Sequence, residues 1–169
     1  NSTRGILAGG RASVTTYNGG YLTSISYIEM ASQGQDASDF GELVEDTRGV
    51  NTASSLTSAG FASPTRGVIA GGGNPRTNVI QYVTIATKGN AKDFGELADE
   101  QALGRNTGFS SPTRGLSAGG LVPSSVNIIQ YVTIATTGDA TDFGDLTVVR
   151  YTPGSGAPST RGVIGGGSN

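Results

Sequence analysis

The chain is built from an internal repeat, and this repeat constrains its fold more than any other feature. Thr-Arg-Gly, followed by a short apolar stretch and a glycine pair or triplet, occurs four times in 169 residues. The four arginines are Arg4, Arg66, Arg114 and Arg161, separated by 62, 48 and 47 residues. Repeats of about 20–50 residues are typical of solenoids and propellers, in which one unit is too small to bury a core alone. Stability is therefore expected to come from packing between neighbouring units.

Two further blocks follow the Thr-Arg-Gly motif in each of the first three copies. One carries a tyrosine among apolar and β-branched residues, and the other contains Asp-Phe-Gly. The blocks are Ser24–Ser32 with Ser38–Leu43, Val79–Thr87 with Lys92–Leu97, and Ile128–Thr136 with Thr141–Leu146. We expect a single repeat domain over 1–169, with repeat 1 at about 1–62, repeat 2 at about 63–110, repeat 3 at about 111–158 and a partial repeat 4 at 159–169.

The second copy shows the strand pattern of one unit most clearly. Gly60–Ala62 and Thr65–Ala70 predict two strands on either side of Pro64, and the second strand ends at a glycine triplet. Asn78–Thr87 predicts the best strand, because it is rich in Val, Ile, Tyr and Thr. A Gly-Asn turn separates it from a short fourth strand at Asp93–Leu97. We therefore predict an all-β chain of four-stranded antiparallel units.

The best strand is apolar on both faces. Side chains alternate along a strand, so Ile80 and Tyr82 point one way, whereas Val79, Val83 and Ile85 point the other. A strand with two apolar faces is buried on both sides. We expect each sheet to lie between two neighbouring sheets, as in a propeller or a stacked solenoid.

Composition excludes several function classes. The net charge is −2, so no strongly basic field exists to hold nucleic acid. The chain has no Cys and no His, which removes disulfides, thiolate chemistry and the commonest acid–base residue. No apolar run approaches the ~18 residues of a membrane span. The 28 glycines and the low charged fraction of 14% suit short strands joined by tight turns.

The order of these blocks resembles the kelch repeat of β-propellers. The wording TRGVIAGGG followed by YVTIATTGDATDFGDL is similar to kelch-like repeats in structural, tail-fibre type proteins of marine phages, especially cyanophages. Phe40, Phe94 and Phe143 stand nearest the place of the usual kelch Trp. The resemblance implies kelch-like propeller blades: about three four-stranded blades and the start of a fourth, within a larger ring or assembly.

Three blades and the start of a fourth are too few to close a normal propeller, because closed propellers have about 4–8 blades. The missing blades belong to a longer polypeptide, to further copies of the chain that close one ring, or to linear stacking in a fibre. We favour the longer polypeptide, since the repeat is interrupted within a blade and the sequence begins with Asn rather than Met.

Several residues recur once per unit and are interpreted as structural contacts. We expect the arginines to contact an aspartate or a backbone carbonyl within or between blades, and the phenylalanines to pack; a ring of arginines that binds an anion is the alternative. Recurring glycines are expected at turns with positive φ. The set of repeat contacts is Arg4, Arg66, Arg114, Arg161, Asp39, Asp93, Asp142, Phe40, Phe94, Phe143, Tyr27, Tyr82 and Tyr131.

Calcium is the metal alternative to a purely structural role of the acidic residues. Asp139, Asp142 and Asp145 lie three apart, and Ca²⁺ prefers oxygen ligands. On a strand, however, residues three apart face opposite ways, and no EF-hand loop is present. Turns and strand ends explain these residues as well, so we predict no metal and no cofactor.

Segments that differ between the copies are the candidates for binding. They are Arg11–Thr23, Glu45–Gly60, Asn74–Thr77, Leu121–Ser125 and Tyr151–Ala157. Tyr17 and Tyr21 lie in the first segment, and exposed tyrosines stack on sugars or on protein surfaces. A cell-surface glycan or protein is therefore the expected partner of these loops.

These observations predict a non-enzymatic module that forms part of a larger structure or binds a partner. The resemblance implies an extracellular or virion-surface structural protein, such as a phage tail fibre, that presents variable loops to a host. A generic protein-interaction propeller is the first alternative. A glycoside hydrolase or lyase is the second, but no carboxylate pair stands apart from the repeat, so catalytic residues are not assigned.

Overall fold

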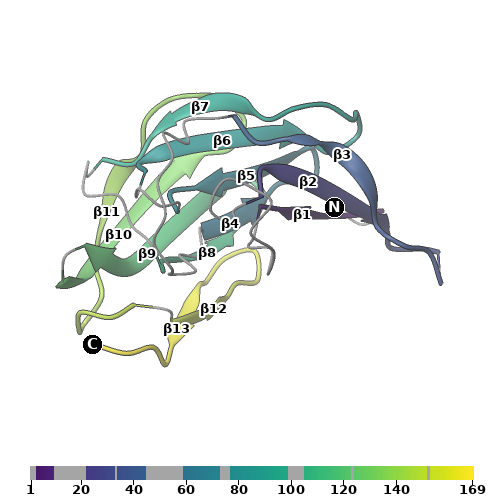
Figure 1. Ribbon diagram of the computed structural model, residues 1–169. Helices are drawn as coiled ribbons and strands as arrows, with labels where there is room; N and C mark the ends of the chain where they lie inside the picture. Colours follow the sequence, from purple (N-terminus) through teal and green to yellow (C-terminus); the bar gives the residue numbers. More distant parts are fainter. Residues whose placement is uncertain are drawn as a thin grey trace.

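The computed structural model of the chain describes residues 3–9, 22–32, 34–44, 59–72, 77–98, 105–122, 124–151 and 153–169. Within these ranges the protein consists of antiparallel β-sheets and contains no helix (Figure 1). The expectation of an all-β, antiparallel chain is confirmed.

The strands form four separate sheets in which neighbours in space are neighbours in sequence. We number the sheets one to four along the chain. Sheet one contains β1 (Arg4–Ala8), β2 (Ser24–Glu29) and β3 (Ser38–Glu42); sheet two β4 (Ala59–Ala62), β5 (Arg66–Ala70), β6 (Val79–Thr84) and β7 (Lys92–Glu96); sheet three β8 (Thr107–Ser110), β9 (Arg114–Val122), β10 (Ser124–Thr133) and β11 (Thr141–Asp145); and sheet four β12 (Gly154–Gly156) and β13 (Val163–Gly165).

The sheets begin one strand before the repeat boundaries read from the sequence. A Ser-Pro-Thr turn joins the first strand of sheets two and three to the strand that starts with the repeated arginine. In this turn the Ser63 amide donates to the Arg66 carbonyl, and the Ser111 amide donates to the Arg114 carbonyl, each at 2.9 Å. Boundaries at 63 and 111 therefore fall inside the sheets, between their first and second strands.

The core lies between the sheets. One buried cluster joins Ile25 and Phe40 of sheet one to Val83 of sheet two, and a second cluster contains Ile80 and Phe94 of sheet two. Ile80 and Val83 are 0% and 1% exposed, although they lie on opposite faces of β6. Sheet two is therefore buried on both faces, as its apolar pattern predicts.

The second cluster lies between sheets two and three. Val132, Ile134 and Ala140 of sheet three supply the side chains that pack against it. They occupy the places in their sheet that Val83, Ile85 and Ala91 occupy in sheet two. The two junctions are thus built from equivalent residues.

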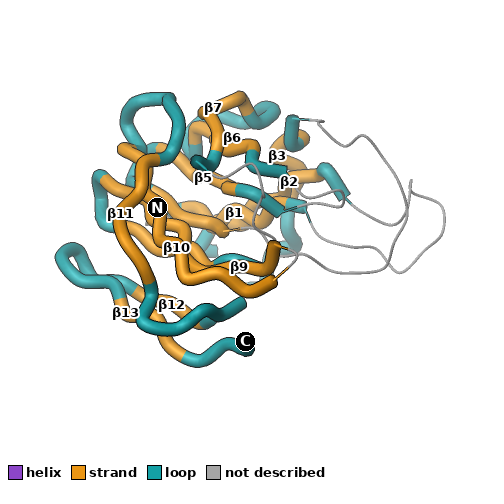
Figure 2. The backbone as a smooth tube through the Cα atoms, turned by 90° about the vertical axis from the view of Figure 1, so that its left-hand side faces the viewer, coloured by secondary structure: helices purple, strands orange, loops and turns teal. Residues whose placement is uncertain are grey.

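The first strands of adjacent sheets approach closely because glycine stands where a side chain would collide. A Cβ on Gly108 of β8 would lie 2.6 Å from the Gly60 carbonyl oxygen of β4. A Cβ on Gly115 would overlap the Phe61 ring, and one on Gly162 would overlap the Phe109 ring. The hairpin of β12 and β13 accordingly lies beside β8, below sheet three in Figures 1 and 2.

Two predictions about strand ends are wrong. The strand expected over Asn78–Thr87 ends at Thr84, because the Thr87 amide donates to the Thr84 carbonyl in a turn. Leu121–Ser125, expected as a variable loop, contains the end of β9 and the start of β10. Its apolar and β-branched flanks continue the ladder, with Leu121 opposite Ser125.

The glycine prediction is confirmed where the repeated glycine pairs are described. Gly9, Gly71, Gly119 and Gly166 have φ of 67°, 70°, 63° and 69°. These left-handed conformations are accessible to glycine at no steric cost. No phosphate-binding role is needed to explain the glycines.

Candidate functional site

The repeated arginines reach from one sheet to the next. Arg4 Nη1 donates to the carbonyls of Ile85 and Ala86 at 3.0 Å each, and Arg66 Nη1 donates to the Ile134 carbonyl at 2.9 Å. Both carbonyl sites lie at the end of the third strand of the following sheet, β6 or β10. A guanidinium suits such a place because it stays charged and offers several N–H donors in a fixed plane.

Each of the first three arginines also stacks on the recurring tyrosine of its own sheet. The guanidinium carbon lies 5.0 Å from the ring centroid of Tyr27 for Arg4, 4.5 Å from that of Tyr82 for Arg66, and 5.0 Å from that of Tyr131 for Arg114. The tyrosine fixes the height of the arginine above the sheet. Arg4 additionally forms an ion pair with Glu29 at 2.7 Å.

The repeated aspartates do not meet the repeated arginines. The side chains of Asp39, Asp93 and Asp142 are exposed on β3, β7 and β11. In each of the first three sheets, the strand with the tyrosine lies between the strand with the arginine and the strand with the aspartate, so a full strand separates the two. Of the two contacts expected for the arginines, Arg4 and Arg66 make the one with backbone carbonyls.

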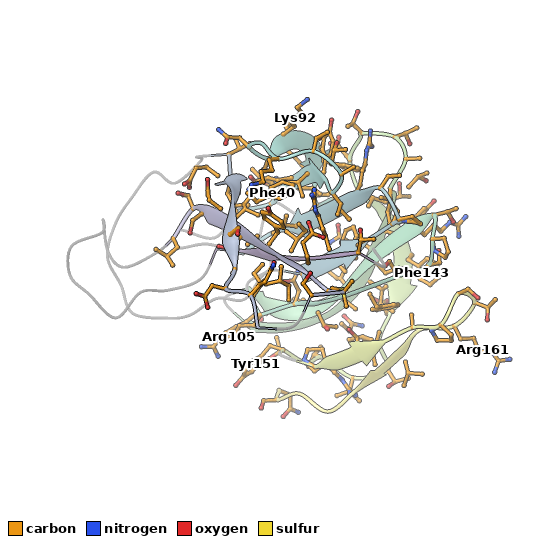
Figure 3. All side chains as sticks on the ribbon, turned by 90° about the vertical axis from the view of Figure 1, so that its right-hand side faces the viewer. Phe40, Lys92, Arg105, Phe143, Tyr151 and Arg161 are labelled. Carbon is orange, nitrogen blue, oxygen red and sulfur yellow. The ribbon has the colours of Figure 1, made fainter. Side chains whose placement is uncertain are left out.

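The tyrosine and phenylalanine of each unit form an edge-to-face pair. Ring centroids are 6.0 Å apart for Tyr27 and Phe40, 5.9 Å for Tyr82 and Phe94, and 5.9 Å for Tyr131 and Phe143. This is a favourable aromatic geometry. Phe40 and Phe94 are 2% and 3% exposed, whereas Phe143 is 53% exposed and lies near the margin of the molecule in Figure 3.

A second set of contacts between sheets was not anticipated from the sequence. It joins the turn before the last strand of one sheet to the last strand of the preceding sheet. Its bonds are Gly89 N to Phe40 O and Ala91 N to Glu42 O at 2.8 Å, Gly138 N to Phe94 O at 2.7 Å, and Ala140 N to Glu96 O at 2.8 Å. The recurrence of Gly-Asx-Ala at 89–91 and 138–140 is the sequence signal that points to this contact.

Side chains add hydrogen bonds to this contact between adjacent sheets. Asn90 Oδ1 accepts from the Glu42 amide at 3.1 Å, and Asp139 Oδ1 accepts from the Glu96 amide at 3.0 Å. Gln130, buried in β10, accepts from the Ala98 amide at 2.6 Å. Asp139, one of the three aspartates considered as calcium ligands in the third copy, is therefore engaged with backbone.

No three acidic side chains within the described ranges gather closely enough to hold a metal ion. Nor do those ranges contain a helix long and apolar enough to cross a membrane. Arg161 is exposed on the turn before β13 and points outward in Figure 3. Tyr17 and Tyr21, the candidate binding residues, lie outside the described residues.

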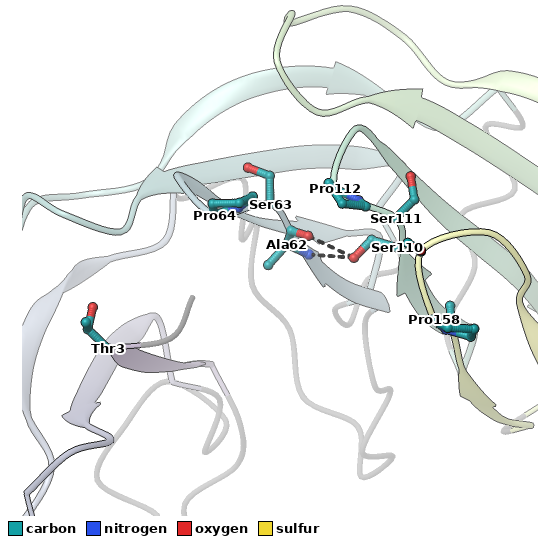
Figure 4. Close-up of a pocket in the computed structure, with 10 residues that line it drawn as sticks. Thr3, Ala62, Ser63, Pro64, Ser110, Ser111, Pro112 and Pro158 are labelled. Atoms are coloured by element: carbon teal, nitrogen blue, oxygen red, sulfur yellow. Dashed lines mark hydrogen bonds between the residues drawn. The ribbon is translucent and has the colours of Figure 1, made fainter.

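An open cleft is lined by the Ser-Pro turns of successive sheets (Figure 4). Its volume is about 660 Å³, and the lining residues are Thr3, Ala62, Ser63, Pro64, Ser110, Ser111, Pro112, Ala157, Pro158 and Ser159. Ser110 Oγ donates to the Ala62 carbonyl at 2.8 Å, and Ser63 Oγ accepts from the Arg66 amide at 3.1 Å. These described lining residues include no acid or base, so the cleft offers a surface of methyl groups, proline rings and hydroxyls.

The chain matches no protein-family model, and no curated protein matches it significantly. Functional inference therefore depends on the contacts described above.

Proposed function

We propose that the chain is a non-enzymatic structural and binding module made of kelch-like propeller blades. It serves a virion or extracellular appendage, as a phage tail fibre does, and presents the segments that differ between blades to a host surface or glycan. Its partners are further blades or further copies of itself.

One observation carries the proposal: the repeated polar side chains join sheets instead of lining an open site. Arg4 and Arg66 bind carbonyls of the following sheet, and Asn90 and Asp139 bind amides of the preceding one. A catalytic site needs acid–base or nucleophilic groups that converge on a reacting atom. Repeated residues that bind an adjacent sheet serve construction.

The open cleft supports the alternative of a protein-interaction platform. Proline rings and hydroxyls at the Ser-Pro turns provide a shallow, uncharged surface on which an extended peptide could lie. The test of the cleft compares the binding partners captured by the intact chain with those captured by Ser111→Arg. This substitution places a long charged side chain in the lining. Loss of every captured partner in that variant would assign binding to the cleft instead of to the variable segments.

A glycan array tests the host-recognition part of the proposal. We expect the intact chain to bind at least one bacterial surface glycan, and Tyr17→Ala with Tyr21→Ala to reduce that binding. The products are examined for cleavage in the same assay, since a hydrolase or lyase would shorten the glycan. Absence of binding across the array contradicts glycan recognition, and cleavage contradicts the non-enzymatic assignment.

A further inference from the structure

The two junctions inside the chain define what one sheet requires of the next. We call the face of a sheet that meets the following sheet its forward face, and the opposite one its rear face. At the first junction, Ile25 and Phe40 of the forward face pack on Val83 and Ala91 of the rear face. The second junction repeats this arrangement with equivalent residues. A forward face is therefore complementary to a rear face.

The forward face of sheet three is covered only in part. The hairpin of β12 and β13 covers its inner strands, where Gly162 lies under Phe109 and the hydroxyls of Thr107 and Ser155 are 2.6 Å apart. Phe143, on the outermost strand, is 53% exposed, in contrast to 3% for Phe94.

An arginine and a glycine of sheet three show the same absence of a covering sheet. Arg114 is exposed, and within the described residues its guanidinium has no carbonyl partner like that of Arg66. A Cβ on Gly95 would collide with the turn of the next sheet, whereas one on Gly144 would meet nothing within 4 Å. Phe143, Arg114 and Gly144, whose counterparts contact the following third strand or turn at the inner junctions, are thus accessible here.

The rear face of sheet one is open in the complementary way. Leu7, Ile28 and Met30 are 56%, 40% and 61% exposed. Ile28 and Met30 occupy the places of Val83 and Ile85 in sheet two, which are 1% exposed. These exposed side chains form the surface that a forward face covers at the inner junctions.

We propose that two copies of the chain associate head to tail through these two surfaces. The rear face of sheet one of one copy packs on the forward face of sheet three of the other. Met30 and Ile28 cover Phe143, and Arg114 donates to the carbonyls of Met30 and Ala31, the counterparts of Ile85 and Ala86.

The strand edges fit the same arrangement. Among the described residues β1 pairs only with β2, so sheet one has no counterpart of β4 or β8. β12 of the first copy takes that place beside β1 of the second. β1 of the second copy then takes the place beside β12 that β13 occupies in the single chain. Both β1 and β13 belong to a copy of the Thr-Arg-Gly repeat. The result is a composite four-stranded sheet of β12, β1, β2 and β3.

The sheet count is compatible with two copies. Because β12 joins sheet one of the other copy, the described part of each copy supplies three sheets, and two copies supply six. Closed propellers have about 4–8. A contact between two different faces closes a ring when its rotation allows it. The sheet count depends on the proposed propeller arrangement, but the contact itself does not.

The decisive experiment compares the intact chain with one variant of each surface by sedimentation equilibrium. We expect the intact chain to show twice its monomer mass of 17.0 kDa. Phe143→Asp and Met30→Asp should each raise the dissociation constant about 30-fold or more, as loss of a central contact does. Because both side chains are exposed in the single chain, neither change should unfold it, which circular dichroism checks. Lys92→Asp, at an exposed position on β7 of sheet two, which forms neither surface, is the control and should leave the mass unchanged.

Mixing the two variants distinguishes a head-to-tail contact from a symmetric one. One junction in the mixed pair has two unaltered surfaces, so part of the dimer should return. Phe143→Trp adds a reporter in a chain without Trp, and its emission should shift to shorter wavelength as the protein concentration rises. A monomer at all concentrations with unshifted emission, or no recovery on mixing, overturns the proposal. Glycan binding by such a monomer would leave the proposed function intact, so the two failures are distinguishable.

Discussion

Sheets two and three carry nearly the same sequence, but their forward faces lie in different surroundings. Phe94 and Phe143 form the same edge-to-face pair with a tyrosine, at 5.9 Å in both cases. The first is buried under sheet three, and the second is more than half exposed. The aromatic pair is therefore a property of the single sheet, whereas burial of the ring is a property of the junction.

The sharpest test of this difference replaces each phenylalanine by alanine. Phe94→Ala should lower the free energy of unfolding by about 3–5 kcal/mol, because it leaves a cavity between two sheets. Phe143→Ala should cost less than about 1 kcal/mol at a low protein concentration, since its ring already meets solvent. Urea unfolding followed by circular dichroism measures both. Equal losses would show that the ring matters within its own sheet instead of at the junction.

The next largest effect is expected at the glycine after each phenylalanine. A Cβ on Gly95 would lie 2.5 Å from the Gly138 carbonyl oxygen, and one on Gly144 would have free space. Both have positive φ, at 148° and 132°, so the strain of an alanine there is common to both. Gly95→Ala should therefore cost about 1–3 kcal/mol more than Gly144→Ala, the cost of overpacking. Thermal melts of the two variants measure this difference. A smaller loss of stability in Gly95→Ala than in Gly144→Ala would contradict the close approach of the turn.

Much of this architecture follows from the sequence, and the rest depends on distant partners. Alternation in Asn78–Ile85 was sufficient to predict a strand buried on both faces. Arg66 could be assigned a structural contact, but not its partner Ile134, which lies in the next sheet. The roles of Asp139 and Gln130 were missed because an exposed turn and a polar strand residue look alike whether or not another sheet is adjacent. Exposure of Phe143 could not be predicted, since its local sequence matches that of Phe94.

A smaller effect is expected where arginine is replaced by lysine. Arg66→Lys keeps the charge but loses the planar donor that both stacks on Tyr82 and binds the Ile134 carbonyl. We expect a loss of about 1 kcal/mol, within the range of one hydrogen bond. Arg114→Lys, which has the tyrosine contact but no carbonyl partner in the described residues, is the control and should change stability by less than about 0.5 kcal/mol. A melting temperature unchanged in Arg66→Lys would exclude the bond between sheets as a source of stability.

The smallest effect concerns the exposed turn that binds the preceding sheet. Asp139 Oδ1 accepts from the Glu96 amide, and the amide of Asn would offer the same acceptor, as Asn90 does at the first junction. Asp139→Ala should therefore cost about 0.5 kcal/mol, the lower end of the range for one hydrogen bond, and Asp139→Asn should restore most of that loss. Hydrogen exchange of the Glu96 amide gives a local measurement: faster exchange in Asp139→Ala than in Asp139→Asn is expected. If calcium were bound here instead, added Ca²⁺ would raise the melting temperature of the intact chain more than that of either variant, because both variants lose a negatively charged ligand. Equal exchange in all three proteins would mean that the peptide bonds of the turn hold the junction without the side chain.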